Sequence, residues 1–207
     1  MTLYKNKYRI ESARYKKWNY AQEGGYFVTV CTKDRHPYFG MISEDAVMNL
    51  SPTGKIVVAE WLRTPDVRPD MNLTLGAFVV MPNHFHAILI IGANAYNSGT
   101  LSNTEMVGVD GDNDVVVVET HCNASLQQQQ QNQFGPQRKN LASVIRGFKS
   151  AVTTQAHIIH PEFAWQPRFH DHIIRNEQEY NRIADYIHNN PRNWKGDKFY
   201  SPTKPAT

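Results

Sequence analysis

The sequence has few cysteines and no long apolar run. Cys31 and Cys122 are its only cysteines among 207 residues and have no paired spacing, which argues against a disulfide framework or a cysteine zinc site and favours a reduced cytoplasm. No apolar run approaches the roughly 20 residues that a membrane span needs, and the segment MTLYKNKYRIESARYKK lacks the apolar centre of a secretory signal. We therefore expect a cytoplasmic protein without a membrane segment, and one domain over residues 1–207.

Basic residues are absent from one segment of the chain. Residues 94–136 contain five acids and no Lys or Arg, and they include the tract QQQQQNQ. The whole chain carries 22 basic and 19 acidic residues, so 22 basic and 14 acidic residues lie outside this segment, a net charge of +8. We interpret 94–136 as an acidic, low-complexity, flexible insertion, and the basic remainder as suited to a polyanionic partner.

Hydrophobic periodicity and turn residues predict the other elements. Residues 44–63 have a helical pattern that Ser51, Pro52 and Gly54 interrupt. Residues 71–92 predict two strands, or one strand kinked at Pro82-Asn83, because proline cannot donate a ladder hydrogen bond. Further segments predict a strand at 24–34, a helix at 139–159, a loop and strand at 163–175, and a helix from an Asn176 cap to a stop at Pro191. This order predicts an α+β sandwich of helices on a mostly antiparallel sheet.

Two histidines stand in an apolar strand, VMPNHFHAILII at 80–91. Residues two apart in a strand point to the same side, so His84 and His86 share one face. Neutral imidazoles so placed can hold a divalent cation, or each can take a separate hydrogen bond. His170 and His172 repeat the same spacing and compete for this role.

The last predicted helix carries a second candidate group. Tyr180, Ile183 and Ile187 share an apolar face, whereas Tyr186 lies about 120° away from Tyr180 around the helix. Asn190 follows Tyr186 by four residues, so the two side chains are neighbours. A phenol beside a carboxamide is a plausible reactive pair, and the alternative is a surface tyrosine above a capping asparagine.

The combination of these motifs resembles a known family. GGYFVTVCTKDR, FVVMPNHFHAILII and FAWQPRFHDHIIRNEQEYNRIADYIHNNPRNW are similar to the REP-associated tyrosine transposases, which are single-tyrosine nucleases of the "HUH" type (His, hydrophobic residue, His). The likeness extends over nearly the whole chain except 94–136. It implies a ferredoxin-like fold, with a central antiparallel sheet and helices packed on it. It also implies DNA transposition by a single-strand DNA endonuclease and strand transferase that acts at hairpin-bearing sequences.

The resemblance assigns roles to individual residues. It implies that Tyr186 is the nucleophile, that His84 and His86 are metal ligands, and that Asn190 stands where relatives place a third ligand. It implies magnesium or manganese as the cofactor. Imidazoles alone suit zinc, copper, iron or nickel, so the residue types do not choose the metal.

The basic surface supplies candidate DNA contacts. Arg14, Lys16 and Lys17 beside Trp18 are suited to gripping phosphates and stacking unpaired bases. Further candidates are Arg146, Lys149, Arg168 and Arg175. We expect hairpin or single-stranded DNA as the partner and, by resemblance to insertion-sequence relatives, a homodimer.

Two other functions remain open from the sequence. One is a non-catalytic, domesticated regulator that binds hairpin DNA or RNA. The other is a histidine-metal hydrolase of small phosphoesters, which would not need Tyr186. We rank it last because no carboxylate lies close in sequence to His84 and His86.

Overall fold

A computed structural model describes residues 18–98 and 138–200. The four strands of the main sheet and the two helices that connect them follow each other along the chain in the order β1 (Gly24–Cys31), α1 (Pro52–Leu62), β4 (Leu73–Met81), β5 (His84–Ile91), α2 (Leu141–Ile159) and β6 (His170–Ile174). A short hairpin, β2 (Gly40–Ile42) and β3 (Met48–Leu50), precedes α1, and α3 (Glu177–Asn189) follows β6. The 3-10 turns are Lys33–Arg35, Pro69–Met71 and Trp194–Gly196.

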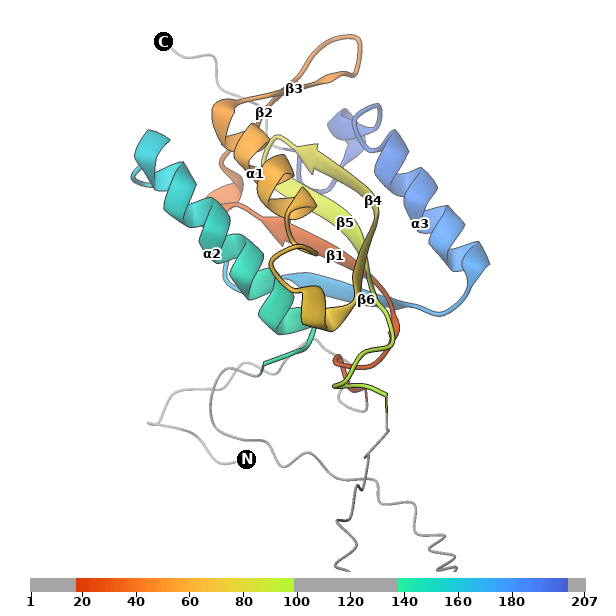
Figure 1. Ribbon diagram of the computed structural model, residues 1–207. Coiled ribbons are helices and arrows are strands. Elements are labelled where there is room, and N and C mark those ends of the chain that lie inside the picture. Colours follow the sequence, from red (N-terminus) through yellow and green to blue (C-terminus); the bar gives the residue numbers. More distant parts are fainter. Residues whose placement is uncertain (1–17, 99–137, 201–207) are drawn as a thin grey trace, which may run out of the picture.

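The four long strands form one antiparallel sheet in the order β4-β5-β1-β6. This βαββαβ arrangement is the ferredoxin-like topology, so the predicted α+β class is confirmed. Helices α1 and α2 cover one face of the sheet, and α3 lies against the other (Figure 1). None of the helices in the described part of the chain has the length and apolar character needed to cross a membrane.

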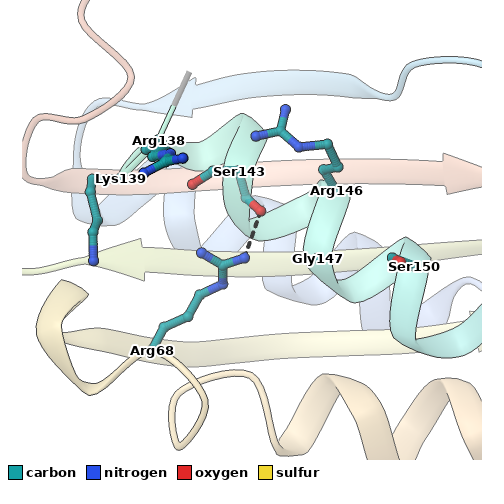
Figure 2. A pocket seen from close by; sticks show the side chains of 7 residues that line it. All are labelled: Arg68, Arg138, Lys139, Ser143, Arg146, Gly147 and Ser150. Carbon is teal, nitrogen blue, oxygen red and sulfur yellow. Dashed lines mark hydrogen bonds between the residues drawn. The ribbon is translucent and has the colours of Figure 1, made fainter. Parts of the chain in front are cut away.

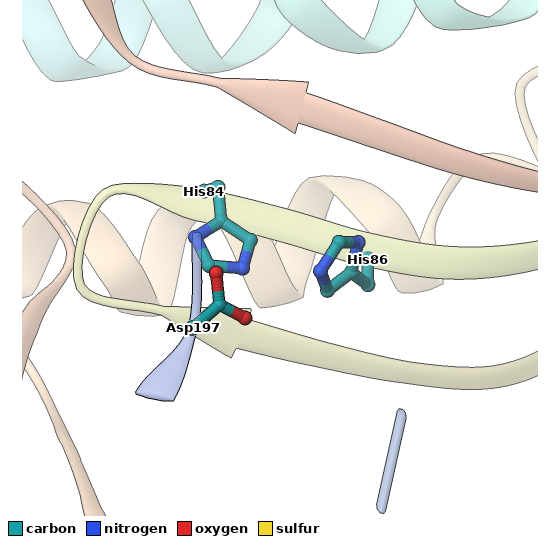
Figure 3. Close-up of side chains that lie close together, drawn as sticks. All are labelled: His84, His86 and Asp197. Atoms are coloured by element: carbon teal, nitrogen blue, oxygen red, sulfur yellow. The ribbon is translucent and has the colours of Figure 1, made fainter. Parts of the chain in front are cut away.

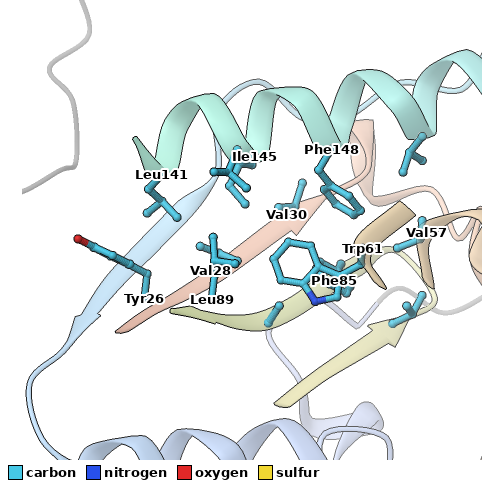
Figure 4. Packing of buried hydrophobic residues seen from close by; sticks show 14 of the residues in the cluster. Tyr26, Val28, Val30, Val57, Trp61, Phe85, Leu89, Leu141, Ile145 and Phe148 are labelled. Atoms are coloured by element: carbon cyan, nitrogen blue, oxygen red, sulfur yellow. The ribbon is translucent and has the colours of Figure 1, made fainter. Parts of the chain in front are cut away.

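The main core lies between the sheet and the α1–α2 layer. Phe85 and Leu89 of β5 point into it, and the ring of Phe85 meets Trp61 of α1 and Phe148 of α2 (Figure 4). Trp61 and Phe85 are completely buried, and each such side chain contributes roughly 1.5–3 kcal/mol by leaving water. Strand alternation then forces the intervening residues of β5, the histidines included, onto the other face.

That other face carries a smaller apolar cluster under α3. Ile88 of β5 packs there with Ile183 and Ile187 of α3, and Tyr180 lies against them. The predicted inward face of the last helix is thus confirmed. At the bulge between Leu75 and Phe78 of β4, a Cβ on Gly76 would lie 2.9 Å from Ile88 Cβ and 2.9 Å from Tyr180 Oη. The missing side chain at Gly76 is therefore what lets α3 pack closely on the sheet.

Local sequence signals such as capping residues and prolines determine where most elements begin and end. One predicted element is wrong. The helix predicted across 44–63 is wrong in its first half, because residues 48–50 form a strand and α1 begins only at Pro52. Ser51 Oγ accepts from Gly54 N, and proline is favoured at the first helical position because its missing N–H is not needed there. Ser51 and Pro52 therefore begin the helix rather than interrupt it.

The remaining predicted segments behave as expected where they are described. Strands β4 and β5 are separate and joined by the turn Pro82-Asn83. Asn176 caps α3, because its Oδ1 accepts from Glu179 N at 2.8 Å. Most of the predicted insertion 94–136 lies outside the described residues, so it and the single-domain assignment stay predictions.

Candidate active site on the α3 face of the sheet

His84 and His86 lie on the α3 face, at the beginning of β5. Both are buried, with exposed fractions of 0% and 1%. Their rings are 4.5 Å apart between centroids, so the shared face predicted from their spacing is observed. A rigid strand in the middle of the sheet fixes both rings far better than a loop could.

Asn83 determines which ring nitrogen of the neutral His84 carries the proton. The Asn83 Nδ2 group donates to the carbonyls of Arg35 (3.1 Å) and Phe199 (2.9 Å), so its Oδ1 faces His84 Nδ1 at 2.9 Å. An amide oxygen only accepts, so Nδ1 must carry the proton. His84 Nε2 then bears a lone pair, and this buried atom has no hydrogen-bond partner among the residues that the structure describes.

Thr29 of β1 holds His86 in a similar way. Its Oγ1 lies 2.8 Å from His86 Nδ1, while His86 Nε2 faces the phenol of Tyr186 at 3.3 Å. Each Nδ1 is thus anchored by a neighbour, as is usual for metal-binding histidines, whose second nitrogen is oriented in this way. The Nε2 atoms of both rings thus point away from these anchors, that of His84 buried and that of His86 toward Tyr186.

Both imidazoles are held neutral. Burial lowers the pKa of His84 well below its ordinary value, and the nearby charges of His86, Lys198 and Arg35 act in the same direction. Burial, followed by Lys198 and His170, lowers the pKa of His86 to about 3. Only a neutral imidazole can bind a cation, so the pair is ready to do so at neutral pH.

Asp197 joins the pair from the segment after α3. One ligand atom from each of His84, His86 and Asp197 can be chosen so that all lie within 4.8 Å of one another (Figure 3). Asp197 Oδ1 also accepts from Phe199 N at 2.6 Å. Sequence reasoning missed this residue, because an isolated acid eleven positions beyond Tyr186 has no recognisable spacing.

Tyr186 lies in the last turn of α3 and Asn190 is the C-cap of that helix. Tyr186 packs edge-on against His86, at 5.4 Å between ring centroids, and remains 42% exposed. Burial and Asp197 raise the pKa of the Tyr186 phenol, and a hydrogen bond with Asn190 opposes this. Asn190 is 1% exposed, and within residues 18–98 and 138–200 its Oδ1 has no hydrogen-bond partner.

The arrangement brings together donors that fit a divalent cation. Two neutral imidazoles and a carboxylate make a mixed nitrogen and oxygen set, and a buried Nε2 without a partner among the described residues is costly unless something binds it. That Asn190 is a further ligand stays a prediction. Two imidazoles with one carboxylate suit several divalent metals, so these residues do not choose the metal. His170 and His172 are not part of this set: His172 Nε2 lies 2.7 Å from Glu179 Oε1.

The predicted DNA contacts are spread over the molecule. Arg14, Lys16 and Lys17 lie outside the described residues. Trp18 Nε1 donates to Tyr26 Oη at 3.1 Å, and the ring packs against the core. The Lys149 ammonium donates to the carbonyls of Gln166 and Arg168.

Three arginines complete the predicted set. Arg146 lies on α2, on the opposite side of the sheet from Tyr186. Arg168 and Arg175 are exposed on either side of β6. A role for each of these residues in DNA binding stays a prediction.

Comparisons with known proteins place the chain among relatives. No family model matches the sequence. An uncharacterized protein of Haemophilus influenzae is 33% identical over 192 residues, which cover 91% of this chain and 92% of that protein. A solved structure of a REP-associated tyrosine transposase bound to a REP hairpin is similar in fold, with a TM-score of 0.50 and 22% identity over 87% of this chain and 73% of that chain. The chain therefore belongs to the same family as the Haemophilus influenzae protein, and it has the fold of the REP-associated tyrosine transposase.

Proposed function

We propose that the protein is a transposase-like, metal-dependent nuclease and strand transferase that cuts single-stranded DNA beside a hairpin. The observation that carries this proposal is the position of the Tyr186 phenol, which lies 3.3 Å from His86 Nε2 and forms a hydrogen bond with the side chain of Asn190. The sequence motifs support the same assignment through their resemblance to REP-associated tyrosine transposases. DNA as the partner is supported by the REP hairpin in the structure of similar fold.

The reaction follows from the residues present. The Tyr186 oxygen attacks the phosphorus of a phosphodiester and loses its proton, and the bond from phosphorus to the 3′ oxygen breaks. The products are a 5′-phosphotyrosine link and a free 3′-hydroxyl. The covalent link conserves the energy of the broken bond, so another 3′-hydroxyl can rejoin the strand without ATP.

Each neighbour of Tyr186 has a part in this step. His84, His86 and Asp197, with Asn190, would hold a divalent cation, and this cation would supply the charge that neutralises a phosphate oxygen and orients the phosphate. The phenol does not lose its proton readily, because burial and Asp197 raise its pKa above the ordinary value of about 10. Lys198 and Arg35, which lie near enough to lower the pKa of His84, add positive charge that attracts the phosphate. We propose Mg²⁺ or Mn²⁺ as the cation.

Mass spectrometry of the intact protein tests the nucleophile. After incubation with hairpin-bearing single-stranded DNA and Mn²⁺, the wild-type protein should gain the mass of the downstream DNA fragment. The variant Tyr186→Phe should form no adduct and still bind the hairpin. Tyr180→Phe is the matched control, since it removes a phenol from the apolar side of the same helix, and it should keep the adduct.

Other results would contradict the proposal. An adduct that survives Tyr186→Phe would refute the assignment of the nucleophile. Hairpin binding without any adduct in the wild-type protein would support the alternative of a non-catalytic regulator that binds hairpin DNA or RNA. A homodimer remains part of the proposal and would be measured by light scattering.

One observation favours a second candidate function. A metal hydrolase of small phosphoesters needs a stronger ligand set than two histidines, and Asp197 supplies a carboxylate beside them. Such an enzyme would act through bound water and would not need Tyr186. Hydrolysis of a small phosphodiester that persists in Tyr186→Phe and disappears in Asp197→Ala would establish this function instead.

A further inference from the structure

A row of side chains crosses the sheet at the level of His86. Thr29 of β1 pairs with His86 of β5 on one side and with His170 of β6 on the other. In an antiparallel sheet, residues paired in this way stand next to one another on the same face. Neighbouring strands lie about 4.8 Å apart, so the Cα atoms of His86 and His170 are roughly 10 Å from each other. The row therefore extends the candidate active site toward β6.

The side chain of His170 points to the same side of the sheet as Tyr186. Further along β6, His172 contacts α3, and Ile174 belongs to the apolar cluster under that helix. Because side chains two residues apart in a strand share a face, His170 turns to this side as well. It also lies near enough to His86 to help lower the pKa of that histidine. His170 is thus part of the surroundings of the site.

His170 differs from the other histidines of this face in its exposure and its contacts. His84 and His86 are buried, and Nε2 of His172 lies 2.7 Å from Glu179 Oε1. His170 is exposed, and its side chain makes no hydrogen bond or ion pair with any residue in the described part of the chain. An imidazole that meets solvent and substrate is the group that enzymes use most often to transfer protons.

The direction of attack by Tyr186 determines where the leaving oxygen goes. In a displacement at phosphorus, the attacking and leaving oxygens lie roughly in line, on opposite sides of the phosphorus. Tyr186 comes from α3, which packs mainly against β4 and β5 (Figure 1), and the strand order is β4-β5-β1-β6. A leaving 3′ oxygen therefore departs away from α3, over β1 and β6, toward the exposed His170.

Other cations are less well placed to protonate this oxygen. The basic residues at the beginning of α2 line a hollow on the α1–α2 side of the sheet, opposite Tyr186 (Figure 2). An arginine is not deprotonated in proteins, which excludes Arg35 as an acid. Lys198 follows the candidate ligand Asp197, so it lies on the cation side of the site, and its ammonium is 4.8 Å from the centre of the Phe199 ring. His170 is the candidate on the side where the oxygen leaves.

We propose that His170 is a second catalytic residue and acts as the acid that protonates the leaving 3′ oxygen. The bond from Tyr186 Oη to phosphorus forms, and the phenolic proton passes to water. The bond from phosphorus to the 3′ oxygen breaks, and this oxygen takes the proton of the His170 imidazolium. In the joining step the neutral imidazole accepts the proton of the attacking 3′-hydroxyl, so the same group serves both directions. This inference rests on the proposed function, because it assigns a role within that reaction.

A DNA substrate with sulfur in place of the bridging 3′ oxygen tests this role. A thiol ionises near about pH 8.5, whereas an oxygen leaving group resembles water, whose pKa is about 15.7, so the sulfur leaves without a proton. With the oxygen substrate and Mn²⁺, His170→Gln should form the Tyr186 adduct about 10²–10⁴-fold more slowly than wild type, the usual contribution of general acid catalysis. With the sulfur substrate, the two proteins should form the adduct at similar rates.

Two further variants separate proton transfer from structural effects. His172→Gln is the matched control, because it removes an imidazole from the same face of β6, where it contacts Glu179. Any slowing in this control should be the same for the oxygen and sulfur substrates, since it would come from a displaced α3. Lys198→Gln tests the competing donor. Rescue by sulfur in Lys198→Gln, and not in His170→Gln, would assign the acid to Lys198 and overturn the proposal.

Two other results would also overturn the assignment. An unchanged rate for His170→Gln with the oxygen substrate would show that His170 transfers no proton in the cleavage step. Equal slowing of His170→Gln with both substrates would show that it only contacts or positions the phosphate. In either case the wild-type protein still forms the Tyr186 adduct, so the proposed function stands. A wild-type protein that forms no adduct with either substrate would contradict the proposed function, and this inference with it.

Discussion

Acid should destabilise this protein through the buried histidines of its candidate active site. The folded-state pKa of His86 is about 3, whereas an unfolded histidine titrates near 6.5. Below about pH 6.5, His86 therefore binds a proton in the unfolded chain but not in the folded chain. The stability that exists above pH 6.5 is lost as the pH falls toward 3.

The magnitude follows from the window between the two pKa values. Each pH unit inside it costs about 1.36 kcal/mol per group, so a change from about pH 7.5 to about pH 5 removes about 2 kcal/mol through His86 alone. The pKa of His84 is lowered in the same direction, so its contribution adds to this loss. The sum is a large part of the 5–15 kcal/mol that typically separates folded from unfolded states.

Denaturant unfolding in the presence of a chelator measures this effect. The free energy of unfolding would be determined at both pH values for the wild-type protein and for His86→Gln, whose amide does not titrate. We expect the wild-type protein to lose about 2 kcal/mol more than the variant between the two conditions. Equal losses in the two proteins would show that His86 is not held neutral by the fold, and the electrostatic account of the site would be wrong.

Two more predictions concern the surroundings of the site. Asn83→Ala removes the amide that orients His84 Nδ1 and anchors Phe199, so Mn²⁺ affinity measured by calorimetry should fall about 10- to 100-fold, whereas Asn49→Ala, on the distant β2–β3 hairpin, should leave it unchanged. Gly76→Ala should force α3 away from Ile88, costing about 1–3 kcal/mol of stability in denaturant unfolding and slowing adduct formation by Tyr186; unchanged stability would mean that the sheet accommodates the methyl group.

Much of the fold could be predicted from local patterns. The alternation of β5 determines that His84 and His86 share a face, and the apolar face of α3 determines that Tyr180, Ile183 and Ile187 turn inward. These elements are regular, so position in the sequence gives position in space. The error at 48–52 arose because Ser51 and Pro52, judged by residue type alone, resemble a helix break. In the folded protein Ser51 Oγ accepts a hydrogen bond from Gly54 N and so begins the helix.

The part of the site that could not be predicted depends on contacts between distant residues. The segment after α3 is held by Arg35, which donates to Lys198 O, and by Asn83, which donates to Phe199 O. These partners are 163 and 116 residues apart in the sequence. No local sequence pattern indicates such hydrogen bonds. The position of Asp197 beside the histidines can therefore be seen only in the folded protein.

The position of α3 at the end of the fold has a consequence for synthesis. All four strands of the sheet, both histidines and the α1–α2 layer precede Tyr186 in the chain, and translation proceeds from the N-terminus. The residues of the sheet and of the α1–α2 layer are therefore translated before Tyr186 and Asp197. If Tyr186 is the nucleophile, as proposed, a chain that stops before α3 carries the two histidines without the group that attacks the phosphodiester.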